Sequence, residues 1–340
     1  MNPPPDTLSP ALRQRLVRYA ELRPCTNAFI DARTPGSDQK ENFTIIGPGV
    51  AENPHQYVHI RDPHGFNIGG ARQPPHCTNS LHSHDSEEVF VAHTGTWRFF
   101  WGEHGDAGEV VLNPGDTISI PIHVFRGFEN IGKDSGFLFA ILGGDDPGRV
   151  HWAPHVIEQA RGHGLVLLDD GNLIDTTLGE SIPPDRRAVE PSTREAIRHI
   201  RVPSNGEMRA RVVARSSVAP NPHSALAASG TGVRESAIIG QASDDGFGVA
   251  PIDIPHGFTL RHLALRQAGE TALHARGCVE VLFVHRGRIE FSDGAGHEAV
   301  LEAGDTLSVP PGLSKRLAAL EEAEIYAVLG GDNPGPVKTA

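Results

Sequence analysis

Two histidines and a glutamate between Leu81 and Gly95 have the types and spacing of a metal site. His82 and His84 are two positions apart, and Glu88 follows four positions later. On a β-strand, residues separated by an even number of positions point to the same face. Two imidazoles and one carboxylate that enter one cavity suit Fe(II) with open coordination positions. We therefore predict that these three residues bind a divalent metal, with Fe(II) favoured and Mn, Ni or Zn as alternatives; the competing interpretation is a surface histidine cluster.

The same pattern occurs a second time with most of its histidines replaced. His274, Arg276 and Glu280 stand where the first copy has its two histidines and its glutamate. Other short segments recur in the same order: IIG at 45–47 and 238–240, PHGF at 63–66 and 255–258, GDT at 115–117 and 304–306, and LGGD at 142–145 and 329–332. Units of this length are complete domains, so the chain is predicted to be a tandem duplication of one domain.

Both units are predicted to consist of antiparallel strands. Apolar and polar residues alternate in the segments 88–100, 116–125 and 279–291, between turns rich in Gly, Pro and Asp. We predict an all-β fold with a few peripheral helices. Its parts are an N-terminal helical extension (1–42), a metal-binding domain (43–150), a linker with a helix (151–234) and a metal-free domain (235–340).

Two segments outside the repeat have the periodicity of helices. In Ser9–Arg23, one helical face carries Leu12, Leu16, Tyr19 and Leu22, and Ser9 is a suitable N-cap. The second segment, His155–Gly162, lies in the connection between the two units. We expect both helices to pack on the barrels or to form a subunit contact.

Composition narrows the class of protein. The chain of 340 residues has 42 acidic and 30 basic side chains, a formal net charge of -12, and no Lys/Arg-rich block. Nucleic-acid binding is therefore not expected. No apolar run is long enough to span a membrane, and the three cysteines are widely spaced without a CxxC pair. We expect a cytoplasmic protein with a small-molecule substrate and no membrane partner; formation of a homo-oligomer stays open.

The two units resemble the cupin superfamily. The first cupin motif, G-x5-H-x-H-x3/4-E-x6-G, is matched at His82, His84, Glu88 and Gly95, and the second, G-x5-P-x-G-x2-H-x3-N, at Gly115, Pro121 and Asn130. The resemblance implies a bicupin, in which two double-stranded β-helix (jelly-roll) barrels follow one another. The layout is similar to that of gentisate-type ring-cleaving dioxygenases, which implies that the metal binds in the N-terminal barrel alone.

The chain departs from the second cupin motif at two positions. His123 stands at the motif's glycine, and Arg126 stands at its metal-binding histidine. Because arginine stays protonated and has no acceptor lone pair, Arg126 cannot replace a histidine ligand. We predict that Arg126 pairs with a carboxylate, phenolate or enolate of the substrate, unless it forms a buried ion pair with Glu88. His123 is a candidate fourth ligand or acid/base group, with an exposed turn histidine as the alternative.

The second unit is predicted to hold no metal. Lys315 stands at the position equivalent to Arg126, so a divalent cation there would meet Lys315 and Arg276 directly. We expect these two cations to form ion pairs with barrel carboxylates such as Glu280. The chemistry of the protein is therefore assigned to the first unit.

Three protein ligands leave coordination positions for a bidentate substrate and dioxygen together. The leading hypothesis is an Fe(II) dioxygenase that acts on a small chelating substrate, such as a dihydroxylated aromatic or an enolised dicarbonyl. One alternative is a metal-dependent isomerase, lyase or hydrolase that uses the ion as a Lewis acid. The other is a non-catalytic bicupin that binds a small ligand.

Overall fold

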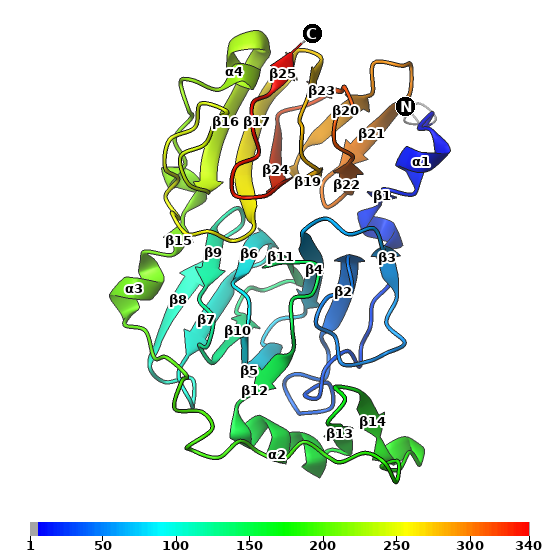
Figure 1. Ribbon diagram of the computed structural model, residues 1–340, viewed down its shortest axis with the longest axis vertical. Helices are drawn as coiled ribbons and strands as arrows, with labels where there is room; N and C mark the ends of the chain where they lie inside the picture. Colours follow the sequence, from blue (N-terminus) through cyan, green and yellow to red (C-terminus); the bar gives the residue numbers. More distant parts are fainter. Residues whose placement is uncertain (1–5, 340) are drawn as a thin grey trace. The chain divides into compact units, whose positions relative to one another are not determined.

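The computed structural model describes residues 6–339 and divides into two compact units, each formed mainly by curled antiparallel sheets (Figure 1). We call residues 23–63 and 67–214 the first barrel, and residues 6–22, 64–66 and 215–339 the second barrel. The predicted all-β jelly-roll fold with few helices is confirmed. The described helices are short: α1 (Pro10–Arg13), α2 (Pro154–Gly162), α3 (Asn205–Arg209) and α4 (Ala225–Ser229), with 3-10 turns η1 (Tyr19–Glu21), η2 (Thr176–Leu178) and η3 (Arg215–Ser217).

The first barrel contains two large sheets. One has the strand order β15-β9-β6-β11-β4-β2-β3, and the other has the order β12-β5-β10-β7-β8. The strands are β2 (Glu41–Ile46), β3 (Val58–Ile60), β4 (Phe66–Gln73), β5 (Thr78–His84), β6 (Glu88–Thr94), β7 (Trp97–Trp101), β8 (Gly108–Leu112), β9 (Thr117–Ile120), β10 (Arg126–Asn130), β11 (Gly136–Gly143), β12 (Val150–Trp152) and β15 (Val212–Val213). A small separate pair, β13 (Leu165–Leu167) and β14 (Leu173–Asp175), follows α2.

An aromatic core holds these two sheets face to face. Phe90 on β6 lies 5.2 Å, between ring centroids, from both Phe99 on β7 and Phe128 on β10. Trp97 and Trp101 on β7 belong to the same buried cluster and have no exposed surface. Because alternate residues of each strand point inward, the apolar alternation seen in the sequence produces this filled core. At one end of the barrel, polar side chains are buried beside the apolar ones.

The second barrel is built on one long curled sheet with the order β1-β22-β19-β24-β17-β23-β20-β21, to which β16 adds through β17. The strands are β1 (Leu16–Val17), β16 (Thr231–Ile239), β17 (Phe258–Glu270), β19 (Glu280–Arg286), β20 (Arg288–Ser292), β21 (Glu298–Glu302), β22 (Thr306–Val309), β23 (Arg316–Ala319) and β24 (Ala323–Gly330). A short pair, β18 (His274–Ala275) and β25 (Lys338–Thr339), forms a separate two-stranded sheet. The core of the second barrel is aliphatic, with Leu263, Leu282 and Leu307 fully buried.

The predicted N-terminal helix over Ser9–Arg23 is wrong. Ser9 does cap a helix, since its side chain accepts a hydrogen bond from Leu12 N, but the helix ends at Arg13. The chain then extends as β1, which pairs with β22 in the second barrel. An edge strand offers unpaired backbone N–H and C=O groups. Pairing with this strand gives the backbone of the segment more favourable hydrogen bonds than a short isolated helix would. The apolar spacing remains meaningful, because Leu12 and Leu16 pack on the core of the second barrel.

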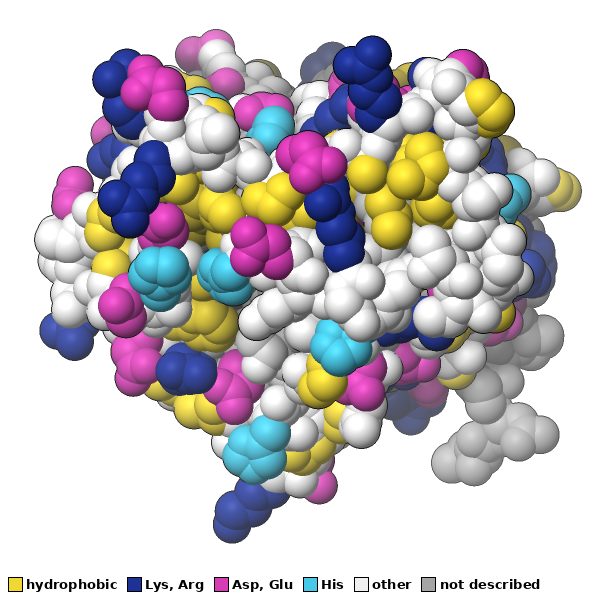
Figure 2. All heavy atoms as spheres, turned by 90° about the horizontal axis from the view of Figure 1, so that it is seen from below, with side chains coloured by type: hydrophobic (Ala, Val, Ile, Leu, Met, Phe, Trp, Pro, Cys, Tyr) yellow, Lys and Arg dark blue, Asp and Glu magenta, His cyan; other side chains and the backbone are white. Residues whose placement is uncertain are grey.

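The second predicted helix, His155–Gly162, is confirmed as α2, in which Val156, Ile157 and Ala160 are buried. Within residues 6–339, the structure contains no helix with the length and apolar character needed to cross a bilayer. On the face shown in Figure 2, acidic and basic side chains are interspersed without a continuous basic area.

Candidate metal centre

The three predicted ligands meet at one end of the first barrel. His82 and His84 lie at the end of β5, and Glu88 is the first residue of β6. Their ligand atoms all lie within 4.8 Å of one another, and the side chains are buried. Among the described residues, this is the one group of three or more His, Cys, Asp or Glu side chains that is close enough to hold an ion.

The route by which these residues converge differs from the expectation of one continuous strand. The chain turns after His84, and β5 and β6 belong to different sheets of the barrel. The histidines therefore approach from one sheet and Glu88 from the other. The even spacing identified three residues that lie close together in the structure, but their convergence depends on the two sheets lying face to face.

Backbone carbonyl groups orient both imidazoles. His82 Nδ1 lies 2.6 Å from the carbonyl oxygen of Ser80, and His84 Nδ1 lies 3.4 Å from that of Arg149. Because a carbonyl can only accept, Nδ1 carries the proton in each ring and donates it, which leaves the Nε2 lone pair free. His84 Nε2 lies 3.6 Å from Glu88 Oε2. Orientation of a ligating histidine through its other nitrogen is usual at metal sites.

Burial keeps both histidines neutral. It lowers the pKa of His82 and of His84 well below the usual histidine value, and the positive charge of Arg126 lowers both further. A neutral imidazole is the form that coordinates a cation, so no proton needs to be displaced. Two neutral imidazoles and a carboxylate fit a divalent metal in both donor type and number.

Arg126 contacts this group of residues without lining the cavity. It lies on β10, and its guanidinium donates to the carbonyl oxygen of His82 at 2.7 Å and to a carboxylate oxygen of Glu88. Only 1% of its surface is exposed. Burial raises the pKa of Glu88, and the adjacent guanidinium opposes that shift. Arg126 is not among the residues that line the neighbouring cavity. Of the two predicted roles of Arg126, a contact with substrate or a buried ion pair with Glu88, the structure shows the ion pair.

His123 lies next to the site through its backbone rather than through its ring. Its backbone N–H donates to the carbonyl oxygen of His84 at 3.3 Å. Its ring stacks edge-on against His199, with 4.9 Å between ring centroids, and does not line the cavity. The residue has a φ of 56°, a left-handed conformation that favours glycine. This explains why the cupin motif has glycine at this position.

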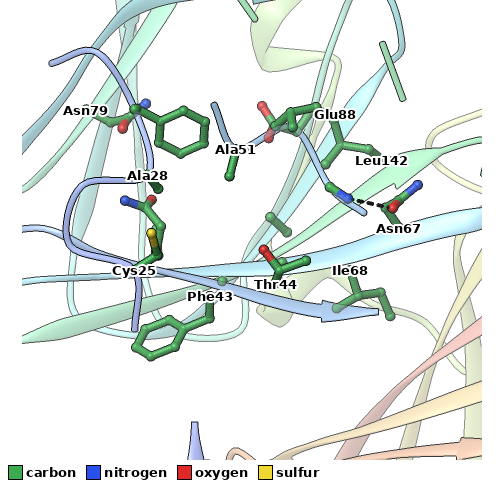
Figure 3. A pocket seen from close by; sticks show the side chains of 18 of the residues that line it. Cys25, Ala28, Phe43, Thr44, Ala51, Asn67, Ile68, Asn79, Glu88 and Leu142 are labelled. Carbon is green, nitrogen blue, oxygen red and sulfur yellow. Dashed lines mark hydrogen bonds between the residues drawn. The ribbon is translucent and has the colours of Figure 1, made fainter. Parts of the chain in front are cut away.

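A cavity of ≈ 70 Å³ adjoins the three ligands, with room for several water-sized groups. Figure 3 shows Glu88, Thr44, Ile68 and Cys25 around it. Most of the wall is apolar, and its polar members apart from the candidate ligands are mainly neutral: Asn42, Thr44, Gln56, Asn67 and Asn79. Such a cavity binds a small molecule mainly through apolar contact and a few directed hydrogen bonds.

Residues that sequence reasoning missed surround His82. The ring of Trp152 lies 5.2 Å, between centroids, from the His82 ring. Asn79 lies 3.4 Å from His82 Nδ1 and accepts a hydrogen bond from the buried ammonium group of Lys40, which is paired with Asp31. Asn79 lies on β5 three positions before His82, but Trp152, Lys40 and Asp31 come from segments farther away in the chain, so no spacing rule connects them with this histidine.

Known structures share this architecture. No protein-family model matches the sequence, and no curated protein matches it significantly. The structure is similar to Lactobacillus farciminis oxalate decarboxylase in its formate complex (TM-score 0.56, 12% identity, 99% of this chain and 91% of that chain). It is also similar to vicilin from Capsicum annuum (0.55, 15%, 96% and 88%) and to the Momordica charantia 7S globulin (0.52, 11%, 96% and 86%).

The protein has the bicupin fold, in which two jelly-roll barrels follow one another in one chain. Proteins with this fold include an enzyme, oxalate decarboxylase, and the vicilins, so the fold alone does not assign an activity. In this bicupin, the candidate groups for chemistry are the residues at the end of the first barrel.

The second barrel of this bicupin has ion pairs at the equivalent position. Lys315 contacts Glu280, and Arg276 lies 3.4 Å from the other carboxylate oxygen. Arg276 also pairs with Glu235 at 2.7 Å. His274 keeps its Nδ1 on a backbone carbonyl, that of Ala272, at 2.9 Å, as His82 does in the first barrel.

Proposed function

We propose that the first barrel binds one divalent metal through His82, His84 and Glu88, and that the protein is a metal-dependent dioxygenase of a small chelating substrate. Fe(II) is the favoured metal. The observation that carries the proposal is the orientation of the two imidazoles, whose Nε2 atoms are left free beside Glu88 at the wall of a cavity. Among the described residues of the second barrel there is no comparable donor set, since Arg276 and Lys315 stand at the equivalent positions.

The metal would supply a Lewis-acidic position that binds the substrate and activates it toward dioxygen. The protein residues then have distinct tasks. Ser80 and Arg149 fix the protonated nitrogens of the histidines through their carbonyl groups. Arg126 holds Glu88 in place. The apolar wall excludes water, which strengthens electrostatic interactions inside the cavity. No side chain is required as a general base, because a chelated acidic group loses its proton readily.

Metal content measured on anaerobically prepared protein tests the proposal. We expect about one iron per chain in the wild type, almost none in His84→Ala, and the wild-type amount in His274→Ala, the matched change in the second barrel. His84→Gln provides a less disruptive second variant, and circular dichroism reports whether each variant folds. Absence of metal from folded wild-type protein after reconstitution with Fe(II), Mn(II), Ni(II) and Zn(II) would leave a ligand-binding bicupin.

Oxygen consumption separates the two catalytic alternatives. A dioxygenase consumes one dioxygen for each substrate converted, whereas a lyase of the kind seen among the structural neighbours, the oxalate decarboxylases, releases carbon dioxide without net oxygen uptake. The similarity to oxalate decarboxylase favours the lyase as the second candidate. Metal-loaded protein is therefore offered catechols, dihydroxybenzoates, enolisable dicarbonyls and oxalate in an oxygen electrode, and carbon dioxide is measured in parallel.

A further inference from the structure

The charges around the candidate metal site cancel before any metal is present. His82 and His84 add no charge to the metal site, because an imidazole coordinates a metal as a neutral ring, and Glu88 is paired with Arg126. Among the residues that line the cavity, Glu88 is the one carboxylate, and none is a lysine or an arginine. The group of three ligands and Arg126 therefore has a net charge of zero.

The nearest other buried charges add nothing to this balance. Lys40 and Asp31 are fully buried and form an ion pair, so their charges cancel. The carboxyl of Glu52 accepts hydrogen bonds from the indole N–H of Trp152 and the backbone N–H of Ile30. Burial raises the pKa of Glu52 to about 8, so near neutral pH this carboxyl is mostly protonated.

A divalent cation would thus leave two uncompensated positive charges in a buried, mainly apolar environment. An uncompensated charge is costly away from water, and the cost grows steeply with the amount of charge. With a neutral histidine at position 126, the carboxylate of Glu88 would cancel one of the two charges. Because Arg126 already neutralises Glu88, that compensation is absent, and the bound ligand has to supply it.

We infer that the ligand of this site is a small chelating dianion, with both negative charges on the oxygens that bind the metal, and that Arg126 determines this charge preference. The inference rests on the proposed metal site. It follows that the rest of the ligand is uncharged, because the remaining cavity wall offers apolar side chains and neutral amides and hydroxyls such as Asn42, Thr44 and Asn67. Arg126 is then a specificity-determining residue that never touches the substrate.

A matched pair of probes tests the charge preference. Oxalate is a dianion, and oxamate has nearly the same shape but one negative charge. Both are titrated against protein loaded with Co(II), whose visible absorption reports changes in its ligands, and their dissociation constants are compared. We expect wild type to prefer oxalate, and Arg126→Gln to reduce the oxalate-to-oxamate affinity ratio by about tenfold or more, since an interaction with one full charge is removed at short range.

Three further variants separate charge from fold. Arg126→Lys retains the positive charge and should retain most of the preference. Arg126→His provides a neutral residue of the type found in the cupin motif and covers the case in which Arg126→Gln does not fold. Arg98→Gln removes an arginine that is paired with Glu129 on the same sheet and partly exposed, and it should leave the ratio unchanged.

The possible failures are distinguishable. If wild-type protein takes up no Co(II), as judged by elemental analysis, the proposed metal site is wrong and the charge inference falls with it. If the metal binds but the affinity ratio is the same in wild type, Arg126→Gln and Arg126→His, the metal site stands and the assigned role of Arg126 is wrong.

Discussion

The two barrels carry the same motif, but the number of cations around its glutamate differs. In the first barrel a single cation, Arg126, faces Glu88, and burial raises the pKa of that carboxyl. In the second barrel Glu280 lies between Lys315 and Arg276, which hold its pKa at about 2 although burial opposes them. Both carboxylate oxygens of Glu280 contact cations, whereas in Glu88 the contact with Arg126 is made by Oε2.

The histidines show the same division. His82 and His274 have the same anchor, a carbonyl two residues earlier in the chain. His274 Nε2 is buried without a hydrogen-bond partner, at the place where His82 would bind metal. The second barrel therefore retains the local geometry that orients a ligand, and what it lacks is a neutral second imidazole and a free carboxylate. The difference between the barrels lies in a few side chains rather than in the fold.

The largest effect is expected from converting the second site into the first. Arg276→His combined with Lys315→Gln restores a His-x-His pair and frees Glu280, so the metal content after reconstitution should rise from about one to about two per chain. The double variant leaves Glu235 with the hydrogen bond from the Ser224 hydroxyl and the electrostatic interaction with Arg261. Elemental analysis of the folded variant measures the outcome.

The matched control for this conversion carries His274→Ala in addition to the two changes and should return the metal content to about one. If the double variant folds and gains no metal, the two sites differ by more than these side chains, and the comparison between the barrels is too simple.

Removal of the central carboxylate should destabilise the second barrel strongly. Glu280→Gln leaves Lys315 and Arg276 with less compensation in a fully buried position, and loss of one partner from a buried ion pair costs about 3–5 kcal/mol. Urea denaturation measures the free energy of unfolding, with a separate spectroscopic signal monitored for each barrel. Glu321→Gln, an exposed glutamate near β24, is the control and should change stability by less than about 0.5 kcal/mol. A loss below about 1 kcal/mol in Glu280→Gln would mean that solvent reaches the network.

The sequence was sufficient to predict the architecture and to select three residues that lie close together in the structure. Recurring segments such as PHGF and GDT identified the duplication, and the alternation of apolar residues identified the strands, because both signals are local. His82, His84 and Glu88 could be chosen for the same reason. The resemblance to the cupin motifs then supplied the barrel that brings them together.

Partners of buried charges could not be predicted in the same way. Lys40 pairs with Asp31, and Arg261 with Asp245, yet each pair joins segments whose contact depends on the path of loops. A charged residue in a sequence is normally expected at the surface, so nothing in its local surroundings marks it as buried. The N-terminal segment failed for a related reason. Its apolar spacing is compatible with a helix, and only the sheet edge at β22 makes an extended strand the better structure.

His274 should make the stability of the second barrel depend on pH. Burial and Lys315 lower the pKa of His274 to about 4, whereas the unfolded chain has the ordinary value near 6.5. Between these two values the unfolded state binds more protons than the folded state, so the free energy of unfolding should fall as pH decreases from about 6.5 to about 4. The full contribution is of the order of 3 kcal/mol.

His274→Gln should remove that contribution, so its free energy of unfolding should vary less than that of wild type over this range. Glu280 titrates in a lower range, between about 4.5 and about 2, and does not mask the effect. The exposed His55 provides the control, because His55→Gln should leave the wild-type slope intact. Parallel curves for wild type and His274→Gln would contradict the low pKa.

The smallest effect is expected at the turn before Arg126. His123 in the first barrel has a φ of 56°, and its equivalent in the second barrel is Gly312, with a φ of 78° and open space around its Cβ position. Gly312→His should cost about 1 kcal/mol through backbone strain alone. His123→Gly relieves the same strain but raises the entropy of the unfolded chain by about 0.5–1 kcal/mol, so the net change should be close to zero. Thermal unfolding of both variants measures this asymmetry.

The metal content of His123→Gly should equal that of wild type, because the His123 ring lies against His199 rather than in the donor group. Loss of metal from folded His123→Gly would instead show that His123 is a fourth ligand. The two barrels would then differ at this position in metal coordination and not only in backbone strain.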